Sequence, residues 1–384
     1  MKIVIAIDSF KGSLTSMEAG EAARDGIQRV YQDGEIVVRP LADGGEGTVE
    51  ALIQGMHGER RKIEVTGPLG EKVWAQYGIL PESKTAIMEM SQAAGLPMVA
   101  KERRNPLETT TYGVGEMIKD GIEQGCRRFL IGIGGSATND GGIGMLQALG
   151  FELLDAEGKQ VPYGAKGLKE LITVSDEHRL PELEACEFCI ACDVENPLCG
   201  EQGCSAVFGP QKGATPEMVW QMDQWMETYA KLVSEKYPTA DAKQPGTGAA
   251  GGLGFAFLTF LPAVLKSGVR CVLEEIHMEE EIQQADVVVT GEGRLDGQTA
   301  MGKAPIGVAQ MAKKYGKPVI GLAGAVTPEA AACNQEGMDA FFPIVRSAVS
   351  LEEAMELEQA KKNLADTAEQ VFRLIRCMEQ NTVR

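Results

Sequence analysis

The chain has 384 residues, of which 44% are hydrophobic and 24% are charged. This size exceeds what a single hydrophobic core usually serves, so two domains are expected. Acidic residues outnumber basic ones by 55 to 37, which gives a net charge of −18 and argues against nucleic acid as a partner. An anionic substrate must therefore be bound by local hydrogen-bond donors, because the overall charge repels it.

The N-terminus and the hydropathy of the chain predict a cytoplasmic protein without a membrane partner. The first ten residues, MKIVIAIDSF, hold an apolar run that is too short for a signal peptide. No apolar stretch approaches the roughly 18 residues that span a bilayer. No exposed pattern indicates an oligomeric state.

Strands and helices are expected to alternate at both ends of the chain. Near the N-terminus, apolar runs predict strands over 2–7 and 35–42, and a helix is expected over about 16–30. Near the C-terminus, ADVVVTGEG, KPVIGLAG and DAFFPIV predict strands, separated by helices such as 305–315, and a final helix is expected over 350–378. This order is typical of a parallel sheet, and strands from both chain ends can share it.

The residues between these ends have a different pattern. RFLIGIGG and EFCIACDV predict further strands, and helices are expected over about 215–236 and 250–266. We therefore predict an α/β protein of two α/β domains. A Rossmann-like domain with a parallel sheet comprises 1–70 plus 286–384, the second domain, 71–285, is inserted into it, and the active site lies in the cleft between them.

Loops after the first two strands carry candidate ligand-binding residues. The first loop places Asp8, Ser9 and Lys11 at a strand end, where open α/β sheets usually bind ligands. The Lys11 cation suits a phosphate or a carboxylate. The second loop, ADGGEGT, sets Asp43 and Glu46 among glycines that let the backbone approach a ligand. Ordinary turns and helix caps are the structural alternatives for these residues.

Two segments in the middle of the chain carry further candidates. In IGIGGSATNDGGIG, the backbone N–H groups of Gly134, Gly135 and Ser136 are predicted to form an anion-binding turn. Asn139 and Asp140 could bind a metal or position a phosphate. Close packing of a strand on a helix uses the same residue types. In ACDVENPL, Asp193 ends an apolar run, so it is a turn acceptor, a general base or a metal ligand. Asn196 follows it, and Lys212 in FGPQKG is another candidate anion contact.

The segment VVVTGEGRLDGQTAMGKAP contains a Walker A spacing from Gly297 to Lys303. Ala304 replaces the magnesium-binding Ser or Thr, and the expected strand ends at Thr290, well before the loop. We therefore expect a phosphate contact without P-loop geometry. The charged candidates in this segment are Glu292, Arg294 and Asp296.

Nine cysteines without a secretion signal indicate reduced thiols. Cys186, Cys189 and Cys192 have the spacing of iron–sulfur ligands, but the apolar residues between them favour a buried strand. The sequence has no Ser-His-Asp or Cys-His arrangement. Glycine-rich loops that carry carboxylates without a nucleophile fit phosphoryl transfer.

Eight segments together resemble the type-1 glycerate kinases, in the order of that family and along nearly the whole chain. They are DSFKGSLT, ADGGEGTVEA, TGPLGEKV, IGIGGSATNDGG, ACDVENPL, FGPQKGA, GAAGGLG and TGEGRLDGQT. The first departs from the usual APDSFKES at Ile7 and Gly12, but it keeps Asp8 and Lys11.

The resemblance implies a kinase of D-glycerate that uses ATP and Mg²⁺ in bacterial breakdown of organic and sugar acids. Two α/β domains, one of them Rossmann-like, belong to this family. Its bacterial members usually give 2-phosphoglycerate, whereas the residues alone do not distinguish the 2-hydroxyl from the 3-hydroxyl. Two alternatives remain open: a non-catalytic two-domain binder of a small organic acid or nucleotide, and an iron–sulfur protein.

Roles follow from this resemblance as hypotheses. Asp193 accepts the proton of the substrate hydroxyl, while Lys11 and Arg294 neutralise the transferring phosphates. Lys11 could instead bind the carboxylate of glycerate. The turn of Gly134, Gly135 and Ser136 holds phosphates. The candidate magnesium ligands are Asp43, Glu46 and Asp296, and the candidate substrate or phosphate contacts further include Asp8, Ser9, Asn139, Asn196, Lys212 and Glu292.

Overall fold

The computed structural model describes residues 1–382 and divides the chain into two compact units. Unit 1 comprises Met1–Asp43, Glu50–His57 and the chain from Val272 onward, and unit 2 comprises Gly44–Val49 and Gly58–Cys271. The predicted architecture is confirmed, because the first unit combines both chain ends and the second is inserted into it. The first boundary lies near His57 instead of residue 70, since residues 59–66 form a strand of unit 2.

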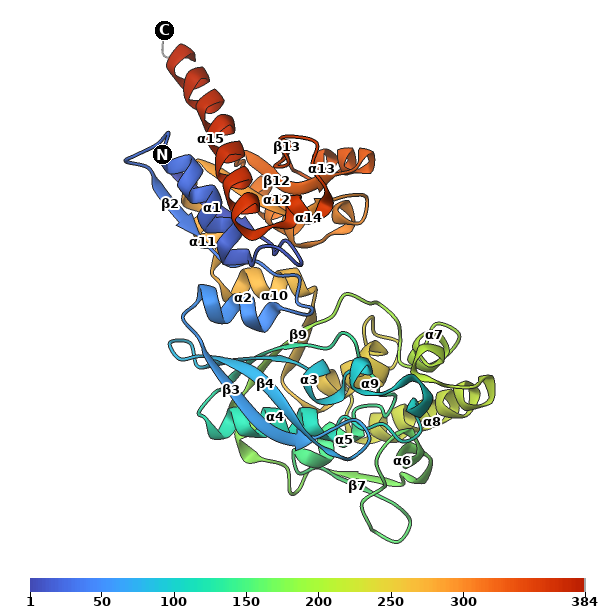
Figure 1. Cartoon of the computed structure of the whole chain (residues 1–384). Coiled ribbons are helices and arrows are strands. Elements are labelled where there is room, and N and C mark those ends of the chain that lie inside the picture. The colour runs from blue at the N-terminus through green and yellow to red at the C-terminus, as the bar shows by residue number, and fades with distance from the viewer. Residues whose placement is uncertain (383–384) are drawn as a thin grey trace. The chain divides into compact units, whose positions relative to one another are not determined.

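Unit 1 contains a parallel sheet with the strand order β13-β12-β11-β1-β2. Blue strands from the N-terminus and orange strands from the C-terminal third lie side by side in it (Figure 1). The predicted strands are all present, although the second ends at Val38 and not at residue 42. The strands are β1 (Lys2–Ile7), β2 (Glu35–Val38), β11 (Val287–Leu295), β12 (Val319–Val326) and β13 (Ala340–Pro343).

The strand β11 is longer than the sequence pattern predicts. Instead of ending at Thr290, it remains paired with β12 as far as Leu295. A side chain on Gly291 would meet the Leu322 carbonyl oxygen at 1.8 Å, so only glycine permits this close pairing. Glu292 and Arg294 consequently lie on the strand, and the loop follows them.

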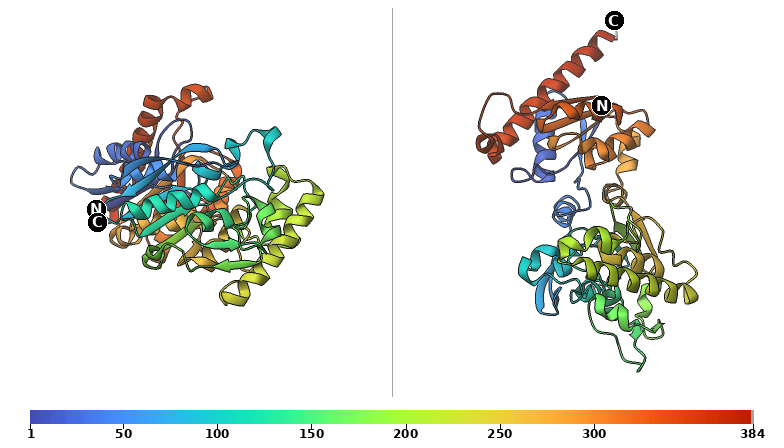
Figure 2. Two further views of the ribbon diagram at one scale, coloured as in Figure 1. Left: turned by 90° about the horizontal axis from the view of Figure 1, so that it is seen from below. Right: turned by 90° about the vertical axis from the view of Figure 1, so that its right-hand side faces the viewer.

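Residues 3–7 of β1 have no exposed surface, because helices cover both faces of this sheet. Ile3, Ile5 and Ile7 share a core with α1 and α15, whereas α12 packs on β11 and β1. In both Figure 1 and Figure 2, the C-terminal end of α15 extends beyond the other elements of its unit. The helices are α1 (Ser16–Gln28), α11 (Met278–Gln284), α12 (Ala304–Lys314), α13 (Ala332–Gln335), α14 (Leu351–Met355) and α15 (Leu357–Thr382), and the chain passes between the units within α2 (Thr48–Gly55) and α10 (Gly268–Glu275).

Unit 2 contains a mixed sheet with the order β10-β9-β6-β5-β4-β3. The first four strands in this order are parallel to one another. The strand β4 pairs antiparallel with β5, and β3 pairs antiparallel with β4. The strands are β3 (Glu59–Thr66), β4 (Lys72–Leu80), β5 (Thr85–Glu89), β6 (Arg128–Gly132), β9 (Glu187–Ala191) and β10 (Ala263–Lys266), with a separate hairpin of β7 (Glu152–Leu154) and β8 (Thr173–Ser175).

The helices of unit 2 are α3 (Ser91–Ala94), α4 (Tyr112–Glu123), α5 (Ile143–Ala148), α6 (Ala165–Glu170), α7 (Cys204–Phe208), α8 (Pro216–Lys236) and α9 (Ala249–Phe260). The helix predicted over 215–236 is present, whereas the one predicted over 250–266 ends at Phe260 and residues 263–266 form the strand β10. The first turn of α9 is irregular, since Ala250, Gly251 and Gly252 all have positive φ. Among residues 1–382, no helix is both long and apolar enough to cross a membrane.

Candidate active site

The carboxyl ends of β1 and β11 meet where the strand order of unit 1 reverses. On one side of this pair lies β2, and on the other lie β12 and β13. Ile7 pairs with Gly291, and the Asp8 N–H donates to the Gly291 carbonyl at 2.8 Å. Open α/β sheets bind ligands at such a reversal. Asp8 and Glu292, the residues directly after this pair, therefore mark the ligand position expected in unit 1.

Three carboxylates influence one another at this point. Burial raises the pKa of Asp8 to about 7, and the negative charges of Asp43 and Glu292 add to the shift. The Ser9 N–H, which donates to Asp8 at 2.6 Å, and the charge of Lys11 oppose it. Burial also raises the pKa of Glu292, with a contribution from Asp43. A bound cation would relieve this repulsion among partly buried carboxylates.

The loop after β1 is held at its far end by the start of α1. Thr15 is the N-cap of this helix, and its hydroxyl accepts the N–H of Glu18 in a capping box. The preceding loop carries Lys11 with an exposed side chain. Helix capping therefore does not account for Lys11, and its side chain is open to solvent.

The end of β11 leads into a turn with its own hydrogen bonds. The exposed Arg294 forms an ion pair with the half-buried Asp296 at 3.7 Å. Although burial opposes the shift, N–H groups of Thr299 and Gln298 lower the pKa of Asp296. The Thr299 hydroxyl donates to Glu292 at 2.6 Å. The Asp296 carboxylate is thus already engaged in closing this turn.

A second set of candidates lies along one edge of the unit 2 sheet. The four parallel strands have their carboxyl ends at this edge, and they end at Glu89, Gly132, Ala191 and Lys266. Asp193 follows β9 with an exposed side chain, and its Oδ1 accepts the Gly268 N–H at 3.0 Å. This hydrogen bond fixes one carboxylate oxygen of a residue that faces solvent.

The glycine-rich turn after β6 has the exposure that a ligand contact requires. Gly134 and Gly135 are exposed, although the residues before and after them are buried. Gly135 has a φ of +70°, and no atom lies within 4 Å of the Cβ position on Gly134. The backbone of the turn is therefore open to an anion.

Lys212 lies beneath this turn with only 2% of its surface exposed. Its ammonium donates to the Ser136 hydroxyl at 2.9 Å and to the Thr138 carbonyl at 2.6 Å. Burial lowers the pKa of Lys212 to about 8, although electrostatic interactions with Cys204 and Asp140 oppose the shift. Through these contacts, Lys212 supports the turn. Because its side chain is buried, it is not expected to contact a ligand directly.

Asn139 and its neighbour Asp140 are also fully buried. The Asn139 amide donates to the Ser205 hydroxyl at 2.9 Å. Asp140 accepts the N–H and the hydroxyl of Thr111 at 2.8 and 2.9 Å. Both side chains hold the segment between the turn and α5. Asn196 is likewise engaged locally, since its amide donates to the Gln202 carbonyl at 2.9 Å.

Glu89 is a residue of this edge that sequence reasoning missed. It is 8% exposed, and one oxygen accepts the N–H groups of Gly47 and Val49 at 3.1 and 3.3 Å. Burial raises the pKa of Glu89, and the Glu46 charge adds to the shift. Glu89 therefore holds the loop that carries Glu46. A carboxylate at the end of the apolar run TAIME was the available signal.

The cysteine spacing is explained by packing. As predicted, Cys189 lies in a strand, β9. Burial raises the pKa of Cys186 to about 11 and also raises the pKa of Cys192. Metal ligation requires thiolates, so these environments disfavour it.

The fold is that of an α/β protein, and its two sheet edges carry an exposed glycine turn, exposed cationic side chains and carboxylates that influence one another. Residues 3–376 match the family model described as the glycerate kinase family. The chain is 46% identical to a glycerate kinase of Haemophilus influenzae, over 98% of this chain and 99% of the relative. It is also 46% identical to a glycerate 2-kinase of Escherichia coli, over 96% and 98%. A crystal structure of a protein assigned as glycerate kinase 2 from Salmonella typhimurium LT2 superposes with a TM-score of 0.90 at 44% identity, and 99% of each chain is covered. The chain belongs to the glycerate kinase family.

Proposed function

We propose that the chain transfers the γ-phosphoryl group of ATP to the 2-hydroxyl of D-glycerate, with 2-phospho-D-glycerate and ADP as products. The observation that carries this proposal is the similarity over nearly the full length to the E. coli protein named glycerate 2-kinase. Phosphoryl transfer depends mainly on positioning and charge neutralisation, which suits loops without a nucleophile. ATP as the donor favours the cytoplasm as the place of the reaction.

Asp193 is the proposed general base. The 2-hydroxyl donates its proton to the Asp193 carboxylate while its oxygen attacks the γ-phosphorus, and the bond to the oxygen that bridges the β- and γ-phosphates breaks. The Gly268 N–H at 3.0 Å orients the carboxylate. The exposure of Asp193 supports this role, because a substrate hydroxyl can reach it.

Lys11 and Arg294 are proposed to neutralise the phosphates of ATP in unit 1. In unit 2, the N–H groups of Gly134 and Gly135 donate to a phosphate or carboxylate oxygen, and Lys212 supports this turn from below through Ser136. Ser9 is expected to assist at the β1 end, where its N–H already binds Asp8. The carboxylate of glycerate needs one cationic partner, for which Lys11 is the alternative candidate.

Magnesium is proposed to bind the carboxylates at the β1 and β11 ends. Asp8, Asp43 and Glu292 offer hard oxygen donors whose mutual repulsion a cation relieves. Within the described residues, no three His, Cys, Asp or Glu side chains form a ready metal cage. Mg²⁺ commonly uses one or two carboxylates together with phosphates and water, so two of these side chains suffice. Of the magnesium ligands predicted from sequence, Asp43 fits this position best. Asp296 closes a turn, and Glu46 lies beside Glu89 in unit 2. The ion would neutralise charge on the β- and γ-phosphates.

A coupled assay of ADP release tests this proposal. The purified chain should consume ATP only when both D-glycerate and Mg²⁺ are present, and EDTA should abolish the signal. ATP consumption that does not depend on D-glycerate, or binding of D-glycerate without turnover, would contradict it. The second result would identify a non-catalytic binder.

A further inference from the structure

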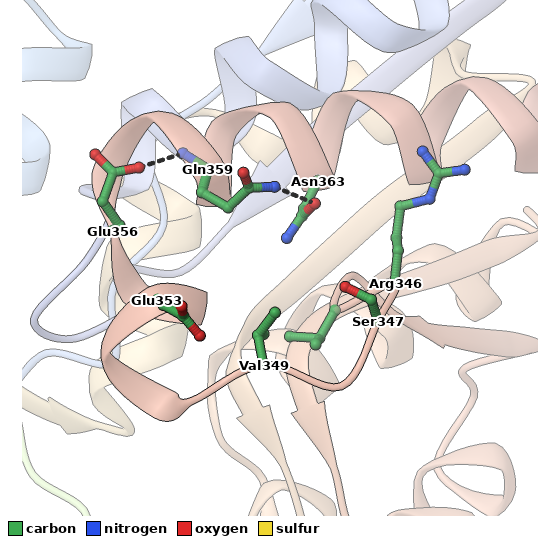
Figure 3. Close-up of a pocket in the computed structure, with 8 residues that line it drawn as sticks. Arg346, Ser347, Val349, Glu353, Glu356, Gln359 and Asn363 are labelled. Atoms are coloured by element: carbon green, nitrogen blue, oxygen red, sulfur yellow. Dashed lines mark hydrogen bonds between the residues drawn. The ribbon is translucent and has the colours of Figure 1, made fainter.

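A pocket in unit 1 lies beside the loop after β13. It has a volume of 340 Å³, which is within the range of roughly 300–1,000 Å³ of small-molecule sites. Its walls are the loop after β13, α14 and the first turns of α15 (Figure 3). The residues that line it are Val345, Arg346, Ser347, Val349, Glu353, Glu356, Gln359 and Asn363.

Asn363 provides an unused donor in this pocket. Its side chain is 8% exposed, and its Oδ1 accepts the Gln359 amide at 2.9 Å. Figure 3 shows its amide nitrogen turned away from Gln359 toward the space beside Val349. Among residues 1–382, this nitrogen has no hydrogen-bond acceptor. This nitrogen is open to the pocket, so an acceptor on a bound molecule can reach it.

The opposite side of the pocket is acidic. Glu353 accepts the Ser350 N–H at 2.9 Å, and this contact lowers its pKa, so that the side chain is ionised at neutral pH. Glu356 accepts the Gln359 N–H at 2.7 Å. Two carboxylates disfavour phosphates in the pocket itself, and they favour hydroxyl donors. The apolar side chains of Val345 and Val349 favour a flat apolar group.

The pocket borders the loop that carries Lys11. A Cβ on Gly12 would lie 2.9 Å from Met355, which stands in α14 between the two glutamates of the pocket. The carboxyl ends of β13 and β1 are also on one edge of the sheet and are separated by three strand spacings, or roughly 14 Å. An extended molecule can therefore reach from the pocket to Asp8 and Lys11.

We infer that this pocket binds the nucleoside part of the nucleoside triphosphate donor. The base stacks against Val349 and accepts the Asn363 amide N–H. The ribose hydroxyls donate to Glu353 or Glu356, as acidic residues do for ribose in other α/β folds. The phosphates then extend toward Lys11. This inference rests on the proposed function only in taking a nucleotide as a ligand.

The test compares Val349→Trp, which fills the pocket, with Leu351→Trp as a matched control. Val349 is 45% exposed and Leu351 76% exposed, so neither change is expected to unfold the chain, and thermal unfolding checks this. Val349→Trp should raise the KM for ATP and the Kd for ADP by about tenfold or more and leave the KM for D-glycerate within about twofold. Asn363→Ala should weaken ADP binding by about fivefold. Leu351→Trp should match the parent chain.

Inorganic tripolyphosphate separates the nucleoside from the phosphates. Its inhibition constant should be the same for the parent chain and for Val349→Trp, because it lacks a nucleoside. If folded Val349→Trp binds ADP like the parent chain, or loses ADP and tripolyphosphate equally, the inference is wrong. If the parent chain binds ADP and the pocket variant does not, while D-glycerate gives no ADP release, the proposed function fails and the inference stands.

Discussion

Lys212 is expected to support the activity of the chain while its buried charge lowers the stability of the fold. Its ammonium is buried without a carboxylate bonded to it, and it holds Ser136 and the Thr138 carbonyl in place. Lys212→Met should therefore lower kcat/KM by about tenfold or more, because the turn loses its support. The melting temperature should stay the same or rise, since a buried charge is removed. Lys231→Met, at an exposed position of α8, is the control and should change neither quantity.

The pH dependence of stability offers an independent check on Lys212. Its pKa is about 8 in the folded chain and about 10.5 when unfolded, so between these values the unfolded state binds more protons. Stability from this group must then rise with pH between 8 and 10.5. The free energy of unfolding of Lys212→Met should exceed that of the parent chain by roughly 1–3 kcal/mol at pH 7. Denaturant titrations should show this difference shrinking toward pH 10, and a constant difference would mean that Lys212 does not titrate as inferred.

Asp193 is the residue whose replacement tests the chemical step. Asn at this position keeps an oxygen for the Gly268 N–H, so the fold of the loop should survive. Loss of the base should reduce kcat by about 100-fold or more. The KM for ATP should remain near that of the parent chain. Near-normal turnover of Asp193→Asn would exclude Asp193 as the base.

At the scale of elements, unit 1 depends on close contact between α1 and α15. A Cβ on Gly26 would lie 2.0 Å from the backbone oxygen of Ala365. Gly26→Ala should destabilise the chain by about 1–3 kcal/mol, because one helix has to move. Chemical denaturation measures this loss. Gln28→Ala, at an exposed position of the same helix, should cost little, and an equal effect of both changes would show that the helix contact is not the cause.

Strands that are buried on both faces could be predicted from the sequence. Strands such as β1, β6 and β9 are short apolar runs, which is the pattern of a parallel strand covered on both faces. The hairpin of β3 and β4 was not predicted, because the charged side chains of ERRKIEVT alternate at an exposed sheet edge. The irregular start of α9 was also missed. Ala250 has a φ of +52°, which is unfavourable for alanine. Such an angle is held by the surrounding packing, so the local sequence does not predict it.

At the scale of the whole molecule, strand order explains which parts of the site could be predicted. Parallel strands collect their carboxyl ends at one edge, so loops after strands bring Asp8 and Glu292 together in unit 1. The same rule places Asp193 beside the turn of Gly134 in unit 2. Burial could not be predicted, because it depends on which helices cover a loop. Lys212 and Glu89 lie in the interior for this reason.

The overall charge of −18 repels both anionic substrates, so their binding depends on the few cationic side chains of the loops. The central claim is that such a chain moves the γ-phosphoryl group of ATP onto the 2-hydroxyl of D-glycerate. The phosphorus NMR spectrum of the product tests it most directly. A doublet, from coupling to the single proton on C2, is the predicted result. A triplet, from coupling to the two protons on C3, or an unchanged ATP spectrum after incubation with D-glycerate and Mg²⁺, would contradict the account.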